Sequence, residues 1–120
     1  MSHQIVKSKD NQHAQELAKL AIDHHLYIDG WSLIDILKDV IAHPKLFTIA
    51  LSFHEETPVG VCVMEEFTYV STFVHPDFRQ KGIGTDLFTS LQVDSMCECV
   101  IGEPQSRHLF KKFNVCIHEQ

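Results

Sequence analysis

The feature that most constrains this chain is a pair of glycines between a predicted strand and a predicted helix. Residues 67–74 are rich in β-branched and aromatic side chains, which predicts a strand, and Pro76 ends it because proline donates no hydrogen bond to a sheet. From Ile83 onward, apolar residues recur four positions apart, as on one face of a helix. Gly82 and Gly84 stand at the junction, where a backbone without Cβ atoms lets a ligand approach the peptide N–H groups.

The charges at this junction favour an anionic ligand. A helix start presents unpaired N–H groups and the positive end of the helix dipole, and Arg79 and Lys81 add full charges. The spacing is not that of a Walker loop, which requires Gly-x4-Gly-Lys-Ser/Thr. It is not a dinucleotide fingerprint either, because Leu87 stands where the third glycine belongs. The junction therefore predicts a phosphate-binding loop of another kind.

A family resemblance specifies that kind of loop. Residues 79–84 read Arg-Gln-Lys-Gly-Ile-Gly. With the strand before it and the amphipathic helix after it, this string closely resembles the acetyl-CoA-binding motif of the GNAT superfamily of N-acetyltransferases, whose core is Arg/Gln-x-x-Gly-x-Gly/Ala. The resemblance implies acetyl-CoA as the cosubstrate. The alternative is a generic strand–turn–helix corner with a basic surface loop.

The rest of the chain predicts a single domain over residues 1–120 with the order β-α-α-β-β-β-α-β-α-β, since 120 residues allow one core. Besides the strand at 67–74, alternation and turn residues predict strands at 4–7, 46–53, 59–64, 96–101 and 114–118. Besides the helix from Ile83, apolar periodicity predicts helices from Asp10 or Asn11 to about Leu26, from Ser32 to before Pro44, and from Pro104 to about Lys112. The serine at 32 opens a capping box with Asp35, and residues 55–58 form a turn. Val59, Val61 and Val63 are expected on one face of their strand, and short links predict an antiparallel meander.

This order resembles that of the GNAT fold over most of the chain. The resemblance implies an α/β (α+β) protein with a mixed, mostly antiparallel central sheet flanked by helices. It also implies a splayed acetyl-CoA cleft between the central strand and the next. GNAT domains usually finish with two strands, and here there is room for one. An apolar sheet edge near Val115 and Ile117 then predicts a homodimer that covers it.

Composition excludes several classes of partner. A net charge of −6 argues against nucleic acid, and no apolar run approaches the ~20 residues that cross a membrane. The first residues lack the apolar core of a signal peptide, so a cytoplasmic location is expected. Cys62 and Cys97 fit buried reduced thiols, Cys97-x-Cys99 lacks zinc-pair spacing, and the nine histidines are scattered, so no metal site is predicted.

The resemblance also assigns cofactor contacts. It implies that backbone groups at the end of the central strand bind the pantetheine arm, and that the loop and helix start bind the pyrophosphate. The predicted cofactor-binding residues are Thr72, Phe73, Val74, Arg79, Gln80, Lys81, Gly82, Ile83, Gly84 and Thr85. The alternative roles are core packing for the side chains at 73 and 74, and solvated surface charge for those at 79 and 81.

The implied reaction is direct attack of an amine on a thioester, which needs a proton acceptor. The candidate bases are Glu65, Glu66 and Tyr69, with Ser71 beside them and His54 and His75 as weaker candidates. The alternative for the two glutamates is a solvated turn. A backbone N–H near residue 73 would stabilise the developing oxyanion.

The last predicted helix departs from the family pattern. Many GNAT enzymes protonate the leaving thiolate with a tyrosine in Leu-Tyr-x-x-x-Gly-Phe. Here Leu109 is followed by Phe110, and Asn114 replaces the glycine. The resemblance implies an N-acetyltransferase for a primary amine, whereas the phenylalanine favours the alternative of a non-catalytic acyl-CoA-binding or protein-interaction module. A lysine side chain, a protein N-terminus, a polyamine and an aminoglycoside all remain open as acceptors.

Overall fold

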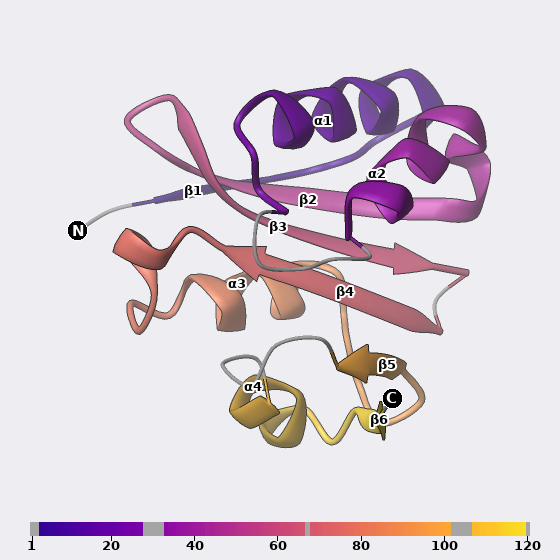
Figure 1. The fold of residues 1–120 in the computed structure, drawn as a ribbon, viewed down its shortest axis with the longest axis vertical. Coiled ribbons are helices and arrows are strands. Elements are labelled where there is room, and N and C mark those ends of the chain that lie inside the picture. The colour runs from indigo at the N-terminus through magenta and orange to yellow at the C-terminus, as the bar shows by residue number, and fades with distance from the viewer. Residues whose placement is uncertain (1–2, 28–32, 67, 102–106, 120) are drawn as a thin grey trace.

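The fold is built on one mixed sheet whose strands lie side by side in chain order (Figure 1). The computed structural model describes residues 3–27, 33–66, 68–101 and 107–119. In these residues the strands are β1 (Gln4–Lys7), β2 (Phe47–His54), β3 (Thr57–Glu65), β4 (Tyr69–Val74), β5 (Glu98–Ile101) and β6 (Cys116–Glu119). The α-helices are α1 (Asn11–Asp23), α2 (Leu33–Ala42), α3 (Ile83–Ser90) and α4 (Arg107–Lys112), and η1 (Pro44–Leu46) and η2 (Pro76–Phe78) are 3-10 turns. The predicted order of strands and α-helices is confirmed.

Strand direction changes at β4. Strands β1 to β4 pair antiparallel, whereas β4 with β5 and β5 with β6 pair parallel. Parallel pairs need long crossovers, which here contain α3 and α4, while short turns join β2 to β3 and β3 to β4. The predicted meander and the mixed, mostly antiparallel sheet are both confirmed.

Helices cover both faces of the sheet (Figure 1). Because neighbouring strand residues point to opposite faces, the sheet builds two apolar clusters. The first joins α1 and α2 to Ile49, Leu51, Val61, Val63 and Phe73. The second joins α3 and α4 to Ala50, Cys62, Met64 and Val70.

A β-bulge in β3 overturns one expectation about these faces. Ser52 pairs with Gly60 but Phe53 pairs with Pro58, so Val59 is an extra residue in the ladder. Its side chain packs in the α3 cluster, not beside Val61 as strict alternation predicted. A bulge shifts the period of two by one residue, which is why the prediction for position 59 was wrong.

The turn before β3 is also shorter than predicted. Glu55 and Glu56 have φ of 50° and 69°, as in the two-residue turns that suit the twist of a hairpin. Thr57 and Pro58 already belong to β3. The proline is accommodated because it lies next to the bulge, where the ladder is interrupted.

The helix ends follow local chemistry. Asp10 caps α1 by accepting a 2.8 Å hydrogen bond from the His13 N–H, as predicted. The helix ends at Asp23, earlier than expected, because the chain turns through His25 at φ 56° before Leu26 is buried. The predicted capping serine at 32, the proline at 104 and the strand residue at 67 lie outside the described residues.

Within the described residues, no helix has the length and apolar character needed to cross a membrane.

Candidate functional site

The divergence of β4 and β5 positions the candidate site. The two strands pair at a single register position, where Tyr69 lies opposite Glu98. The Glu98 N–H donates a 2.6 Å hydrogen bond to the Thr68 carbonyl just before this position. Beyond it, the described residues contain no further pair between these strands. The strands therefore separate toward the C-terminal end of β4, as the predicted splay requires.

The backbone of β4 directs alternate peptide groups toward β5. The His75 N–H donates to the Val59 carbonyl at 2.8 Å, and this antiparallel register makes the odd-numbered residues from 69 to 75 the ones that bond to β3. The peptide groups of Thr72 and Val74 then point away from β3. These two predicted cofactor-binding residues thus present backbone hydrogen-bonding groups on the diverging side.

Phe73 is placed differently from its two neighbours. Its register partner is Val61 of β3, and its side chain is 2% exposed in the cluster beneath α1 and α2. The side chain therefore has the core role that was its alternative assignment. The backbone groups that point away from β3 belong to the residues on either side of it, and among them the Val74 carbonyl accepts a hydrogen bond from Nε of Arg79.

The loop between β4 and α3 is a left-handed corner. Gln80 has φ 64°, and Gly82 has φ 81° and ψ 3°. The Gly82 carbonyl accepts the N–H of Asp86 at 3.0 Å, and this is the bond that opens the helix. The N–H groups of residues 83–85 come before it, so they have no partner within the helix. They lie at the positive end of the helix dipole, which suits an anion.

The two loop glycines are required for different reasons. A Cβ added at Gly82 would meet no atom within 4 Å, so the positive φ alone favours glycine there. A Cβ added at Gly84 would lie 2.8 Å from Cδ2 of Leu109. Gly84 therefore lets α4 approach α3 closely.

Arg79 turns back onto β4. Its Nε donates a 2.9 Å hydrogen bond to the Val74 carbonyl, and its guanidinium carbon lies 5.4 Å from the centre of the Phe73 ring, a cation–π contact. Lys81 is exposed on the loop. Phosphate contacts by these two side chains remain predictions. The structure places the guanidinium at the end of β4, beside the diverging strands.

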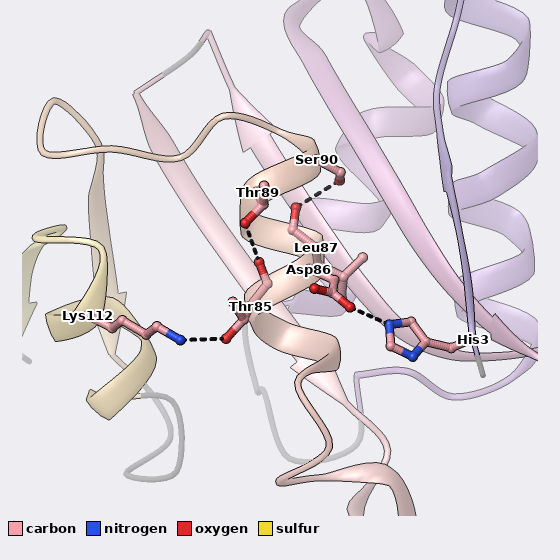
Figure 2. Close-up of polar contacts among 7 residues, drawn as sticks. All are labelled: His3, Thr85, Asp86, Leu87, Thr89, Ser90 and Lys112. Carbon is pink, nitrogen blue, oxygen red and sulfur yellow. Dashed lines mark hydrogen bonds and ion pairs between the residues drawn. The ribbon is translucent and has the colours of Figure 1, made fainter. Parts of the chain in front are cut away.

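A lysine that the sequence analysis did not single out reaches the start of α3. Nζ of Lys112, on α4, lies 3.4 Å from Oγ1 of Thr85 (Figure 2). On the other side of α3, the Asp86 carboxylate contacts Nε2 of His3 at 2.6 Å (Figure 2). The helix start thus has a cation on its α4 side, and its own acidic residue is engaged elsewhere. Basic residues are common in the last turn of helices, so nothing in the sequence marked Lys112.

The candidate bases divide between β4 and the turn before it. Tyr69 is 53% exposed at the start of β4, and Ser71 is half-buried on the same strand. Both point to the face that carries α1 and α2, because alternate residues share a face. Glu65 ends β3, and Glu66 is exposed in the turn with φ 50°. The tyrosine and the serine lie on β4 itself, the tyrosine at the position that still pairs with β5; which group acts as the base stays a prediction.

The two weaker candidates gather around Phe78. The rings of His54 and His75 lie 5.2 and 5.8 Å from its ring centre. Nδ1 of His75 also accepts the N–H of Asp77 at 3.1 Å. These contacts support the turn η2, which is a structural role for both histidines.

Phe110 lies in the core. It is 4% exposed, and its ring centre is 5.4 Å from that of Phe88 on α3. A hydroxyl at this position would need both space and a hydrogen-bond partner. The position that carries a tyrosine acid in the family pattern therefore carries a packing residue in this chain.

Two of the buried thiols, Cys62 and Cys99, are poor nucleophiles near neutral pH. Cys62, Cys97 and Cys99 are buried and belong to no disulfide, and burial was predicted for the first two, while Cys116 is exposed. Burial, reinforced by the neighbouring Cys97, raises the pKa of Cys62 above its ordinary value. Burial also raises the pKa of Cys99 to about 11. Both thiols therefore stay protonated at physiological pH.

A surface hollow beside β1 does not suit the cofactor. It is lined by His3, Gln4, Val6, Phe53, Glu55 and Glu56. The two glutamates are exposed and would repel phosphate groups.

No protein-family model matches the sequence, and no curated protein matches it. The fold, however, is similar to solved acetyltransferase structures. An acetyltransferase of Trypanosoma brucei aligns with a TM-score of 0.57 at 18% identity, over 99% of this chain and 96% of that one. The ribosomal-protein-alanine N-acetyltransferase of Brucella melitensis biovar Abortus 2308 aligns with a TM-score of 0.54 at 13% identity, over 100% and 81%.

A putative acetyltransferase from Salmonella typhimurium, solved with its cofactor acetyl-CoA, covers 76% of this chain and 61% of its own at 17% identity. Its TM-score of 0.49 is too low to bear on this protein. The first two structures span nearly the whole chain and share its mixed sheet flanked by helices. The chain therefore has the fold of the GNAT acetyltransferases.

Proposed function

We propose that this protein binds acetyl-CoA and transfers its acetyl group to a primary amine. The observation that carries the proposal is the divergence of β4 from β5 just before a left-handed loop into α3. One stretch of chain thus offers the backbone groups of Thr72 and the N–H of Val74 on the diverging side, and the N–H groups of residues 83–85 that have no partner within α3. A pantetheine arm can bond to the first set as an added strand, and a pyrophosphate can bind the second.

The proposed reaction requires the protein mainly to position acetyl-CoA and the amine and to accept the proton that the amine loses. Acetyl-CoA supplies an acetyl group activated as a thioester, so the acceptor nitrogen bonds to the carbonyl carbon and the carbon–sulfur bond breaks. Tyr69, Ser71, Glu65 or Glu66 would take the proton that the amine must lose. A backbone N–H of β4 would stabilise negative charge on the carbonyl oxygen. Because a thiol has a pKa of ~8.5, the thiolate can depart near neutral pH without an acid.

The second candidate function is a non-catalytic acyl-CoA-binding or protein-interaction module. The buried ring of Phe110 favours it, because no phenol is available there to protonate the departing thiolate. The loop and the diverging strands fit both functions equally.

The first experiment tests acetyl-CoA binding by thermal unfolding and calorimetry. A ligand at 100 times its dissociation constant adds about 2.7 kcal/mol of apparent stability. Gly82→Leu strains the left-handed backbone at the helix start and adds a bulky side chain beside the N–H groups proposed to bind the anion. We expect the shift in the wild type and its loss in the variant, each measured against its own ligand-free midpoint. If millimolar acetyl-CoA produces no shift of the thermal midpoint and no heat of binding, the assignment of acetyl-CoA is refuted.

The second experiment separates the enzyme from the binding module. Thiol release from acetyl-CoA is measured with lysine peptides, free peptide N-termini, polyamines and aminoglycosides, in the wild type and in Phe110→Tyr. Release that depends on the acceptor supports the transferase. A correctly placed phenol is worth about 10²-fold or more as a general acid, although a buried hydroxyl without a partner would lower stability. Tight binding of acetyl-CoA with no acetylated product from either form would leave the binding module as the function.

A further inference from the structure

Three side chains with metal-ligating atoms meet on one face of β5 and β6. The parallel register places Cys116 opposite Glu98, and His118 follows two residues along β6, so it points to the same face. Oε1 of Glu98 lies 2.8 Å from Nε2 of His118, and Sγ of Cys116 lies 3.8 Å from the same nitrogen. A carboxylate oxygen, a sulfur and an imidazole nitrogen thus lie within 4.8 Å of one another.

This arrangement differs from a catalytic relay of thiol, imidazole and carboxylate. In a relay, one ring nitrogen faces the nucleophile and the other faces the acid. Here both contacts use Nε2 of His118. The three atoms converge on a single point, as the ligands of a cation do.

The distances suit a zinc-sized cation after small side-chain movements. Bond lengths of about 2.3 Å for Zn–S and about 2.0 Å for Zn–N separate sulfur and nitrogen by about 3.5 Å in a tetrahedron. The observed separation is 3.8 Å. The nitrogen and the carboxylate oxygen would need about 3.3 Å, and they are 2.8 Å apart. Because His118 and Cys116 are exposed, rotation of their side chains can supply these shifts.

The donor set selects the class of metal. A thiolate together with an imidazole suits Zn²⁺ and its neighbours Co²⁺ and Ni²⁺, whereas Mg²⁺ and Ca²⁺ prefer sites made of oxygen. Three protein ligands leave a fourth position for water. Since the ligands come from two strands, a bound cation would tie β6 to β5.

We propose that Glu98, Cys116 and His118 bind one divalent cation of the zinc class. The site lies where β5 is still paired with β4, opposite Tyr69, so it needs neither the loop nor acetyl-CoA.

The test uses the full chain, reduced and stripped of metal with a chelator. Co²⁺ is titrated first, because a cobalt–thiolate bond gives a charge-transfer absorption that histidine or carboxylate sites do not. Zn²⁺ should then displace the cobalt at one equivalent and raise the thermal midpoint by mass action. Loss of one ligand should weaken binding by at least about tenfold, since even outer-shell changes weaken metal sites that much. Cys116→Ser should lose the absorption, and His118→Gln and Glu98→Gln should need much more metal.

Two matched variants control for adventitious binding. Cys99→Ala removes a thiol from β5, the strand of Glu98, on the opposite face of the sheet. His24→Gln removes an exposed histidine from the end of α1. Both should keep the cobalt spectrum and the one-to-one stoichiometry. The proposal is overturned if the wild type gives no thiolate band in excess Co²⁺, or if Cys116→Ser, with an unchanged circular dichroism spectrum, binds Zn²⁺ as tightly as the wild type.

Discussion

At the scale of single residues, the two glycines of the loop belong to one motif but are required for different physical reasons. Gly82 adopts a φ of 81° in open space, whereas Gly84 lies under Leu109 of α4. A substitution at the first position strains the backbone, and at the second it crowds the Leu109 side chain. Only the contacts of each residue distinguish the two cases.

This difference predicts a coupling between Gly84 and Leu109. Gly84→Ala should destabilise the fold because the new Cβ would lie 2.8 Å from Cδ2 of Leu109. Overpacking of this kind costs about 1–3 kcal/mol. Shortening the leucine relieves the clash, so Gly84→Ala with Leu109→Val should cost less than the sum of the two single changes. Denaturant unfolding of the double-mutant cycle measures this.

Gly82→Ala with Leu109→Val is the matched control for that cycle. Because nothing lies within 4 Å of an added Cβ at Gly82, its cost should come from positive φ alone, about 1–2 kcal/mol, and should add to the cost at 109. Equal coupling energies in the two cycles would contradict the assigned roles.

At the scale of elements, α4 does more than close the crossover between β5 and β6. It packs Leu109 onto the start of α3 and brings Lys112 to Thr85. The loop between β4 and α3 contributes Arg79, which bonds back to the end of β4. The positive charge at the proposed pyrophosphate site therefore comes from α4 and from the loop into α3, which are separate in the chain.

Lys112 supplies a direct test of that arrangement. Lys112→Ala should weaken acetyl-CoA binding about two- to fivefold, the effect of one exposed ion pair, and the loss should shrink as salt is raised. The control, Lys111→Ala, removes an exposed lysine from the same helix, so the two variants have the same net charge. Titration calorimetry at two salt concentrations gives both comparisons. An equal loss in the two variants would mean that only the overall field matters.

At the scale of the whole molecule, the sheet has an edge at β6. In the described residues, β6 pairs with β5 alone and forms one edge. Val115 is 5% exposed and Ile117 packs against the α3 cluster, so the apolar edge expected there is covered within the protomer. What remains is a row of backbone groups on the outer side of β6, which still offers a partner a strand to pair with.

A homodimer through this edge is the corresponding prediction. Pairing of two β6 strands would satisfy the open backbone groups without needing an apolar patch. Sedimentation equilibrium at micromolar concentration should show a species of twice 13.8 kDa. A single species of 13.8 kDa across the concentration range would rule it out.

The sequence by itself determined the order and type of the elements and the position of the loop. Those features depend on local chemistry: apolar periods of two and near four, the cap at Asp10, and glycines where the chain must turn or approach. They persist in the structure because each is decided by a few neighbouring residues.

Only the tertiary structure decided which distant residues meet. A bulge moved Val59 to the other face, the crossing of α4 over α3 carried Lys112 to Thr85, and the parallel register set Glu98 beside His118. The cysteine spacing gave no sign of that last cluster, because its members lie on different strands. Strand register and helix crossing depend on packing over the whole core, so a local sequence pattern predicts neither of them.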